Sequence, residues 1–374
     1  MKRIVMFYAD AGGGHRSAAD AISSALRKLY GERYQISYVN GFRRLPRLIR
    51  YADTDYPSWV NYARGLYALS FHASNGRRRV ALIRKAFETI SDPVAADIVL
   101  NEPADVYVSC HPIYNGAIPQ AIKRLGSTAK FINVVTDLVT GHVAHYVPDV
   151  DLCIVPTEEA REEAIENLVP PEKIVITGQP VWPDFRTRMG NRKATRQQLG
   201  LDDSKPVVLL IGGGDGMGRL GVTGREIAFS GLPIQLVVVC GRNQAVKRDL
   251  EFINPRVSAM RVLGFVNNIP ELMGAADILV TKAGPGTIAE AFIAGLPIVL
   301  YDAVPGQEEG NVHYVVNRGA GAWCPVLPSA VVKQLKLLVA NPQRIAAMRQ
   351  ASISLAKPDS ALDIAQIVAR YAGD

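Results

Sequence analysis

The sequence of 374 residues is poor in cysteine and has no apolar run long enough to cross a bilayer. Its four cysteines lie far apart, without a C-x-x-C pair or a histidine at metal-site spacing: Cys110, Cys153, Cys240 and Cys324. This spacing argues against a disulfide framework or a zinc site and favours buried thiols in a reducing compartment. Because a spanning helix needs about 20 apolar residues, any membrane contact is expected to be peripheral. The first apolar segment is short and runs into glycines, so no signal peptide is expected.

An acidic excess is also absent. Lys and Arg number 42 and Asp and Glu 35, which gives a formal net charge of +7 and favours an anionic partner. Much of this excess lies in the segment 42–87, which holds ten Lys or Arg residues and two acids. The charge is therefore concentrated on one part of the chain.

The basic segment 42–87 also carries aromatic residues. Basic residues among aromatic anchors suit the headgroup level of an anionic membrane. The predicted membrane contacts are Arg43, Arg44, Arg47, Arg50, Trp59, Arg77, Arg78 and Arg79. A solvated basic face is the alternative, whereas nucleic acid is not expected as a partner because no nucleic-acid fold signature accompanies the segment.

Short β-rich apolar runs alternate with helical patterns along the whole chain, and the pattern starts again near residue 206. Such alternation predicts parallel sheets covered by helices on both faces. We therefore expect an α/β fold of two Rossmann-like domains that face a cleft, comprising residues 1–180 and 181–354. Two prolines near the boundary interrupt any regular element. A closing helix in 355–374 is expected to pack back on the first domain.

Two glycine-rich loops each follow a predicted strand: "ADAGGGHR" at 9–16 and "GGGDGMG" at 212–218. Open α/β sheets bind ligands at the carboxyl ends of their strands, where backbone N–H groups and helix N-termini can receive an anion. A nicotinamide dinucleotide is not favoured at the second loop, because the next strand ends in Cys240, Gly241 and Arg242 and not in an acid for the ribose. Diphosphate binding is favoured over a merely structural turn.

The segment 281–311 combines three polar features. Pro285 opens a predicted helix, Glu290 lies one turn into it, and a loop after the next strand offers Gln307 and Glu308. A helix N-terminus, a carboxylate and a polar loop at one edge suit a ligand that carries phosphates and many hydroxyls, such as a nucleotide-sugar.

This segment, with "ADAGGGHRSAADAI", "SCHPIYNG", "VVTDL" and "GFVNNI", closely resembles the monogalactosyldiacylglycerol synthase and diacylglycerol glucosyltransferase family. The resemblance covers nearly the whole chain and is most specific in its C-terminal half. It implies the GT-B glycosyltransferase fold and a more distant relation to the enzyme that forms lipid II. The implied reaction moves galactose or glucose from UDP-galactose or UDP-glucose to 1,2-diacylglycerol with inversion. No tightly bound cofactor or metal is expected, because helix ends and loop amides can neutralise the leaving diphosphate and no acid pair has metal-ligand spacing. The expected location is peripheral, on the cytoplasmic side of an anionic membrane.

The resemblance also assigns donor-binding residues in the second half of the chain. Glu290 would accept hydrogen bonds from the uridine ribose, and Gln307 and Glu308 would hold sugar hydroxyls. Phe265 and Val266 would border the uracil. The residues expected around the diphosphate are Gly213, Gly214, Met217, Gly284, Pro285, Gly286 and Thr287. A surface position for Glu290, plain loop roles for Gln307 and Glu308, and a core position for Phe265 stay open.

His15 is the expected catalytic base. An alcohol attacks well only when a base removes its proton, and a histidine with a pKa near 6.5 is suited to this. Strand-end geometry puts His15 at the mouth of the first domain, and the resemblance assigns the base to this position. A role in stabilising the loop beside the helix N-cap is the alternative.

Other residues of the first half are expected on the acceptor side: Gly13, Gly14, His111, Pro112 and Asp137. Asp137 or His111 could serve as an alternative proton acceptor, and both could instead be structural strand-end residues. Plant-type members have a Trp after the histidine of this strand-end segment, whereas this chain has "GHVAHYVPD", with His145 and Tyr146.

Three other functions stay open from the sequence. The enzyme could use another lipid acceptor, as in peptidoglycan precursor synthesis, or it could be a UDP-sugar epimerase. A nucleotide-sugar-binding peripheral membrane protein without turnover is the non-enzymatic alternative. Galactose is the first expectation for the sugar and glucose the second.

Overall fold

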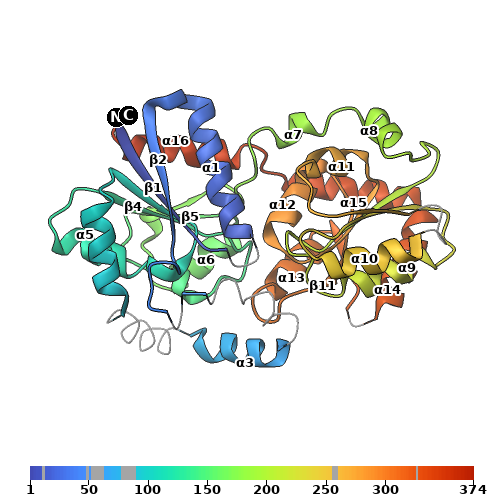
Figure 1. The fold of residues 1–374 in the computed structure, drawn as a ribbon, viewed down its shortest axis with the longest axis horizontal. Coiled ribbons are helices and arrows are strands. Elements are labelled where there is room, and N and C mark those ends of the chain that lie inside the picture. Colours follow the sequence, from blue (N-terminus) through green and yellow to red (C-terminus); the bar gives the residue numbers. More distant parts are fainter. Residues whose placement is uncertain (11–12, 48–49, 52–62, 77–89, 255–259, 326) are drawn as a thin grey trace. The chain divides into compact units, whose positions relative to one another are not determined.

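The computed structural model describes the chain except for residues 11–12, 48–49, 52–62, 77–89, 255–259 and 326 (Figure 1). It divides into two compact units. Unit 1 comprises Met1–Pro183, Pro305–Gln307 and Asp359–Asp374, and unit 2 comprises Asp184–Val304 and Glu308–Pro358. Four of the expected membrane contacts lie outside the described residues: Trp59, Arg77, Arg78 and Arg79.

Unit 1 is built on a six-stranded parallel sheet with the order β2-β1-β3-β4-β5-β6. Its strands are β1 (Lys2–Tyr8), β2 (Tyr34–Asn40), β3 (Val106–Ser109), β4 (Lys130–Val134), β5 (Leu152–Val155) and β6 (Ile174–Ile176). Its α-helices include α1 (Gly14–Tyr30), α3 (Arg64–Ser74), α5 (Ala117–Arg124), α6 (Glu158–Glu166) and α16 (Ser360–Tyr371). Short 3-10 helices are η1 (Gly31–Arg33), η2 (Pro112–Tyr114), η3 (Val143–His145) and η4 (Pro171–Lys173).

The alternation of side chains along β1 explains how both faces of this sheet are covered. Ile4 and Met6 join the core formed with α1 and α16, whereas Val5 and Phe7 join the core formed with α5 and α6. Since side chains of a strand point to opposite faces in turn, a continuous apolar run fits a strand buried on both sides. The C-terminal helix α16 packs beside α1, and its buried face includes Ile364.

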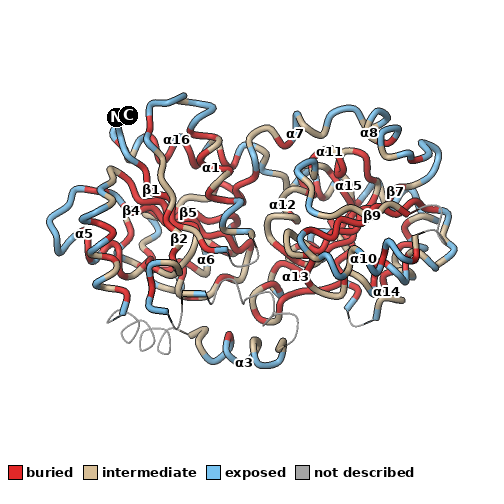
Figure 2. Tube along the Cα trace, in the orientation of Figure 1, coloured by how far each residue is buried: buried red, intermediate tan, exposed pale blue. Residues whose placement is uncertain are grey.

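Unit 2 contains a second six-stranded parallel sheet, with the order β12-β11-β10-β7-β8-β9. Its strands are β7 (Val207–Ile211), β8 (Gln235–Val239), β9 (Met260–Leu263), β10 (Ile278–Lys282), β11 (Ile298–Asp302) and β12 (Gly321–Trp323). Its helices are α7 (Phe185–Arg188), α8 (Arg192–Gln198), α9 (Leu220–Ala228), α10 (Gln244–Ile253), α11 (Ile269–Ala275), α12 (Pro285–Ala294), α13 (Glu309–Asn317), α14 (Pro328–Val339) and α15 (Pro342–Leu355). Figure 2 shows that the central strands of each sheet are buried.

Each sheet has a point at which the strand order reverses, between β1 and β3 in unit 1 and between β7 and β10 in unit 2. Connections from the two strands at such a point diverge to opposite faces, which leaves room for a ligand at their carboxyl ends. The predicted α/β class with two Rossmann-like parallel sheets is confirmed. None of the helices in the described part of the chain is long and apolar enough to span a bilayer.

Candidate functional site

His15 lies in the first turn of α1, directly after the loop that follows β1. Gly13 precedes this helix with a φ of +79°, a left-handed conformation that glycine adopts without steric cost. The His15 Nδ1 atom lies 2.8 Å from the carbonyl oxygen of Cys110 and 2.9 Å from Thr136 Oγ1. Cys110 follows β3 and Thr136 follows β4, so the carboxyl ends of three neighbouring strands position this imidazole.

The contact with a backbone carbonyl determines which nitrogen of His15 carries a hydrogen. A carbonyl oxygen can only accept a hydrogen bond, so Nδ1 must be the donor and Nε2 keeps its lone pair in the neutral ring. Burial lowers the pKa of His15 below its ordinary value, and the Asp137 carboxylate partly offsets this effect. The ring is therefore neutral near pH 7, with Nε2 able to accept a proton.

His111 lies beside His15, and its neutral ring is held in the opposite tautomer. The ring centroids are 4.7 Å apart in an edge-to-face contact. The His111 Nδ1 atom accepts a hydrogen bond from the Ile113 N–H at 3.3 Å, so the neutral ring carries its hydrogen on Nε2. Burial lowers the pKa of His111 well below its ordinary value. This geometry suits a hydrogen-bond donor and argues against His111 as a proton acceptor; Pro112 follows it as the first residue of η2.

Asp137 is a buried carboxylate with partners on both oxygens. Its Oδ2 lies 3.3 Å from His145 Nε2, and its Oδ1 accepts a hydrogen bond from Gln307 Nε2 at 3.1 Å. Burial raises the pKa of Asp137, but the hydrogen bond and charge of His145 outweigh this effect and hold the pKa below its ordinary value. Asp137 is therefore a weak base, better suited to stabilising positive charge on the histidines than to taking a proton.

Several polar residues around these histidines were not singled out from the sequence. Asn133 Nδ2 donates to the backbone carbonyl of His145 at 2.7 Å, and Asn115 Nδ2 donates to the same oxygen at 3.1 Å. Thr136 was part of the quoted stretch "VVTDL" but received no role. A polar residue in an otherwise apolar strand or at its end was the available signal, although many such residues are structural.

In unit 2, the glycine loop follows β7 at the reversal point of the sheet. Gly216 has a φ of +56°, and a Cβ atom there would lie 2.2 Å from the carbonyl oxygen of Cys240, so only glycine fits. The carbonyl oxygen of Gly214 accepts a hydrogen bond from the Arg242 N–H at 2.9 Å. Gly213 also has a positive φ, and Met217 is buried beneath the loop. These contacts give the loop one defined shape.

The loop after β10 leads into α12, whose first turn is rich in small residues. Gly284 is the N-cap residue and Pro285 the first helical residue, followed by Gly286 and Thr287. Proline is favoured at this position because its missing N–H would have no intrahelical partner. The free N–H groups of this turn and the helix dipole favour an anion.

Glu290 lies in the same helix and is half-buried. Burial raises the pKa of Glu290 to about 7. Within the described residues, its carboxylate has no hydrogen-bond partner and no ion pair. A carboxylate in this state gains stability from any ligand that donates hydrogen bonds to it.

Two cations near the glycine loop were missed from the sequence. Arg242 forms an ion pair with Asp215 at 3.1 Å, and its guanidinium lies 4.8 Å from the ring centroid of Phe265. Lys282 ends β10 beside Gly213 and forms an ion pair with Glu308. The signal for both was a basic residue at the carboxyl end of a predicted strand.

Phe265 and Glu308 differ in their burial. The Phe265 side chain is 54% exposed, so the core alternative was wrong, and Val266 beside it is partly buried. Glu308 is only 4% exposed, and its Oε2 accepts a hydrogen bond from the Val304 N–H at 2.9 Å. Gln307 belongs to the short segment grouped with unit 1, where its Oε1 accepts a hydrogen bond from Tyr67 Oη at 2.9 Å.

The described part of the basic segment uses several of its charges internally. Arg44 forms an ion pair with Glu102, and Arg43 Nη1 donates to the carbonyl oxygen of Arg50 at 3.0 Å. Arg50 in turn donates to a backbone carbonyl, whereas Arg47 is exposed. Arg43, Arg44 and Arg50 therefore also stabilise the loop that carries them.

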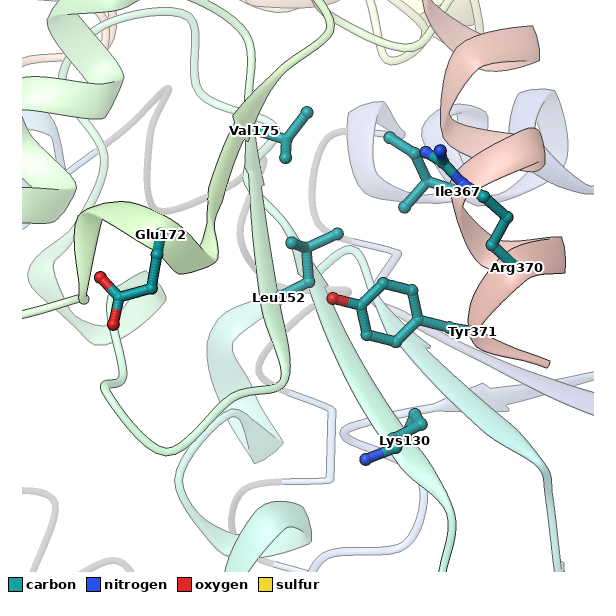
Figure 3. A pocket seen from close by; sticks show the side chains of 7 residues that line it. All are labelled: Lys130, Leu152, Glu172, Val175, Ile367, Arg370 and Tyr371. Carbon is teal, nitrogen blue, oxygen red and sulfur yellow. The ribbon is translucent and has the colours of Figure 1, made fainter. Parts of the chain in front are cut away.

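A cavity of about 510 Å³ lies elsewhere in unit 1 (Figure 3). Its lining residues are Lys130, Leu152, Glu172, Val175, Ile367, Arg370 and Tyr371. Lys130 and Leu152 are the first residues of β4 and β5, so the cavity lies toward the amino ends of these strands. It contains none of the predicted site residues, which follow the carboxyl ends.

Two family models match this chain. Residues 15–181 match the model for monogalactosyldiacylglycerol (MGDG) synthase, and residues 219–364 match the glycosyltransferase family 28 C-terminal domain. The chloroplastic monogalactosyldiacylglycerol synthase of Spinacia oleracea is 35% identical over 382 residues, which cover 97% of this chain and 71% of the relative. Monogalactosyldiacylglycerol synthase 1 of Arabidopsis thaliana is 31% identical, with 97% and 70% covered.

Solved structures with little sequence identity share the fold. Acinetobacter baumannii MurG is 17% identical with a TM-score of 0.63, and the alignment covers 99% of this chain and 100% of that chain. Staphylococcus aureus MnaA, solved with UDP, is 14% identical with a TM-score of 0.66 and coverage of 99% and 97%. These similarities identify the GT-B fold, and the family models identify a glycosyltransferase. The chain belongs to the monogalactosyldiacylglycerol synthase family.

Proposed function

We propose that this enzyme transfers galactose, or alternatively glucose, from a UDP-sugar to the free hydroxyl of 1,2-diacylglycerol with inversion. The observation that carries the proposal is the His15 imidazole, whose Nδ1 is held by the Cys110 carbonyl while Nε2 makes no hydrogen bond within the described residues. Relatives named as monogalactosyldiacylglycerol synthases support the acceptor, and neighbours solved with UDP support the donor class.

In the proposed reaction, His15 Nε2 takes the proton of the acceptor hydroxyl while the hydroxyl oxygen attacks the anomeric carbon of the sugar. The bond between that carbon and the diphosphate oxygen breaks, and UDP leaves with the bonding electron pair. Attack opposite the leaving group inverts the anomeric configuration. A base of this kind contributes about 10²- to 10⁴-fold to the rate.

The donor would bind to unit 2 at the reversal point of its sheet. The loop at Gly213, Gly214 and Met217 and the first turn of α12 would receive the diphosphate through backbone N–H groups. Glu290 would accept hydrogen bonds from the ribose, and Phe265 and Val266 would border the uracil. Gln307 and Glu308 would hold sugar hydroxyls. Arg242 and Lys282 lie near this loop and would offset the charge that develops on the leaving diphosphate.

The acceptor would bind to unit 1 beside His15. Gly13 and Gly14 would let the acceptor approach the backbone, His111 would donate a hydrogen bond from Nε2, and Asp137 would stabilise the imidazolium formed at His15. We further propose that the basic segment 42–87 docks the enzyme on the anionic cytoplasmic surface of a membrane, where diacylglycerol is available.

A panel of donors tests the proposed function. Purified protein is given diacylglycerol micelles with UDP-galactose, UDP-glucose or UDP-N-acetylglucosamine, and UDP release and glycolipid are measured. We expect galactose or glucose transfer that requires the lipid. Absence of UDP release above background with all three donors refutes the proposal, and conversion of the donor without lipid indicates an epimerase.

The His15→Ala variant separates a catalyst from a binding protein. A catalyst loses about 10²- to 10⁴-fold in kcat while its UDP affinity is retained, because His15 lies in unit 1 and the residues expected around UDP lie in unit 2. His313→Ala provides the matched control, since His313 is exposed on α13 and is not among the predicted site residues. A His15→Ala variant that keeps the wild-type kcat contradicts the assignment of the base.

A further inference from the structure

We propose that Thr136 is a positioning residue that holds the His15 imidazole, whose tautomer the Cys110 carbonyl sets, in the orientation required of a general base. This inference rests on the proposed function for its kinetic consequence but not for its geometry. Thr136 lies two residues beyond β4 and is only 3% exposed. No role for it follows from the sequence pattern.

Three polar atoms lie within hydrogen-bond distance of one another: His15 Nδ1, the Thr136 hydroxyl oxygen and the Cys110 carbonyl oxygen. Thr136 Oγ1 lies 2.9 Å from His15 Nδ1 and 3.5 Å from the Cys110 carbonyl oxygen, and this carbonyl oxygen lies 2.8 Å from Nδ1. The hydroxyl is therefore close to both members of the histidine–carbonyl pair. The three groups come from different connections of the sheet, after β1, β3 and β4.

The possible hydrogen positions favour one arrangement. A threonine hydroxyl has one hydrogen and two lone pairs, whereas the carbonyl has lone pairs only. If the Thr136 hydroxyl donated to Nδ1, the nitrogen lone pair would face the Cys110 carbonyl oxygen at 2.8 Å without a hydrogen between them. If Nδ1 carries the hydrogen, both oxygens can accept it and the hydroxyl hydrogen can turn toward the carbonyl. This second arrangement leaves the lone pair on Nε2.

No charged or titratable side chain around His15 in the described structure makes the hydrogen bond to Nδ1 that Thr136 makes. The His111 ring meets His15 edge-to-face, and the His145 ring stacks on it at a centroid distance of 6.4 Å. Asp137 acts on His15 through its charge, while its carboxylate oxygens contact His145 and Gln307. Thr136 is the one side chain in the described structure with a hydrogen bond to His15 Nδ1.

Thr136 also has an advantage over serine in this position. Its β-branched side chain restricts rotation about χ1, so the hydroxyl keeps its direction. A serine retains the hydroxyl but has a freer rotor, whereas a valine retains the shape and removes the hydroxyl. The Thr136→Ser and Thr136→Val variants therefore separate the hydrogen bond from the packing of the side chain.

The test combines NMR and kinetics on the full chain. Histidine-selective ¹⁵N labelling reports which ring nitrogen of His15 carries the hydrogen, with His15→Ala used to assign its signals. We expect a protonated Nδ1 in the wild type and in Thr136→Val, because the Cys110 carbonyl remains as an acceptor, and a shifted Nδ1 resonance in Thr136→Val, because the second acceptor is lost. With diacylglycerol and the active UDP-sugar, kcat should fall about 10- to 100-fold in Thr136→Val with little change in the donor KM. Thr136→Ser should recover most of the activity.

Thr140→Val is the matched control, since the Thr140 hydroxyl is buried and has no hydrogen-bond partner within the described residues. It should leave the His15 Nδ1 resonance and kcat unchanged. Wild-type kcat in Thr136→Val refutes the inference, and so does an unchanged His15 Nδ1 resonance in this variant or a wild-type ring protonated on Nε2. If the wild type transfers no sugar from any donor, the proposed function fails, while the NMR comparison still decides the role of Thr136.

Discussion

Glu290 is expected to make donor binding depend on pH. Burial raises the pKa of this carboxyl to about 7, so about half of the free enzyme carries a protonated Glu290 at neutral pH. Ribose hydroxyls that donate hydrogen bonds favour the ionised carboxylate. Donor binding should therefore lower the pKa of Glu290 and release a proton, and the donor affinity should rise as the pH rises through 7.

The size of this effect follows from the ionised fraction of Glu290. With a pKa of about 7, roughly 9% of the free enzyme is ionised at pH 6 and roughly 91% at pH 8. If only the ionised form binds the ribose well, the association constant increases by up to about tenfold between these pH values. This increase corresponds to about 1.4 kcal/mol of binding free energy.

Isothermal titration calorimetry with UDP-glucose measures this dependence. The diphosphate of UDP-glucose is a diester that does not titrate between pH 6 and 8, so the ligand adds no proton equilibrium of its own. Titrations in buffers of different ionisation enthalpy count the released protons directly. We expect a net release near pH 7 and a much smaller one at pH 8, where most of the free enzyme is already ionised at Glu290.

Two controls isolate the Glu290 contribution. Glu290→Gln keeps the size of the side chain but cannot ionise, so its affinity should be weaker at pH 8 and nearly independent of pH. A UDP-glucose analogue without the ribose 2′-hydroxyl should bind to the wild type with a reduced pH dependence. Equal pH dependence in the wild type and in Glu290→Gln refutes the assigned contact between Glu290 and the ribose.

Three further predictions concern folding stability and the donor loop. Glu163 lies in α6, and burial raises its pKa in the folded protein to about 7. The free energy of unfolding should therefore fall as the pH rises from about 4.5 through 7. Gln cannot ionise, so the free energy of unfolding of Glu163→Gln should exceed that of the wild type by up to about 3 kcal/mol more at pH 8 than at pH 4.5. Urea unfolding measures this difference, and a difference that does not change with pH contradicts the prediction. Gly216→Ala should lower stability by about 1–3 kcal/mol and weaken UDP binding, because its Cβ would clash with the Cys240 carbonyl; an unchanged melting curve argues against the clash. Arg242→Ala should weaken UDP binding more at low than at high salt, and salt-independent loss would exclude a Coulombic role.

Much of the fold was predictable because local patterns were consistent. The apolar run of β1, the glycines after it and the helical spacing of α1 together predicted a strand, a loop and a helix. In the same way, Gly284 and Pro285 marked the start of α12. These signals depend on neighbours in the sequence, so they were readable without the tertiary structure.

The sequence by itself therefore determined the two parallel sheets, the glycine loops at strand ends and the candidacy of His15 and Glu290. Only the tertiary structure decided that His15 Nδ1 meets the Cys110 carbonyl and Thr136, which are 95 and 121 positions away in the chain. It also decided that Glu290 has a raised pKa and that Phe265 is exposed. The physical reason is that hydrogen positions, burial and pKa depend on groups from several strand ends, and the sheet order that joins those ends has no local sequence signal.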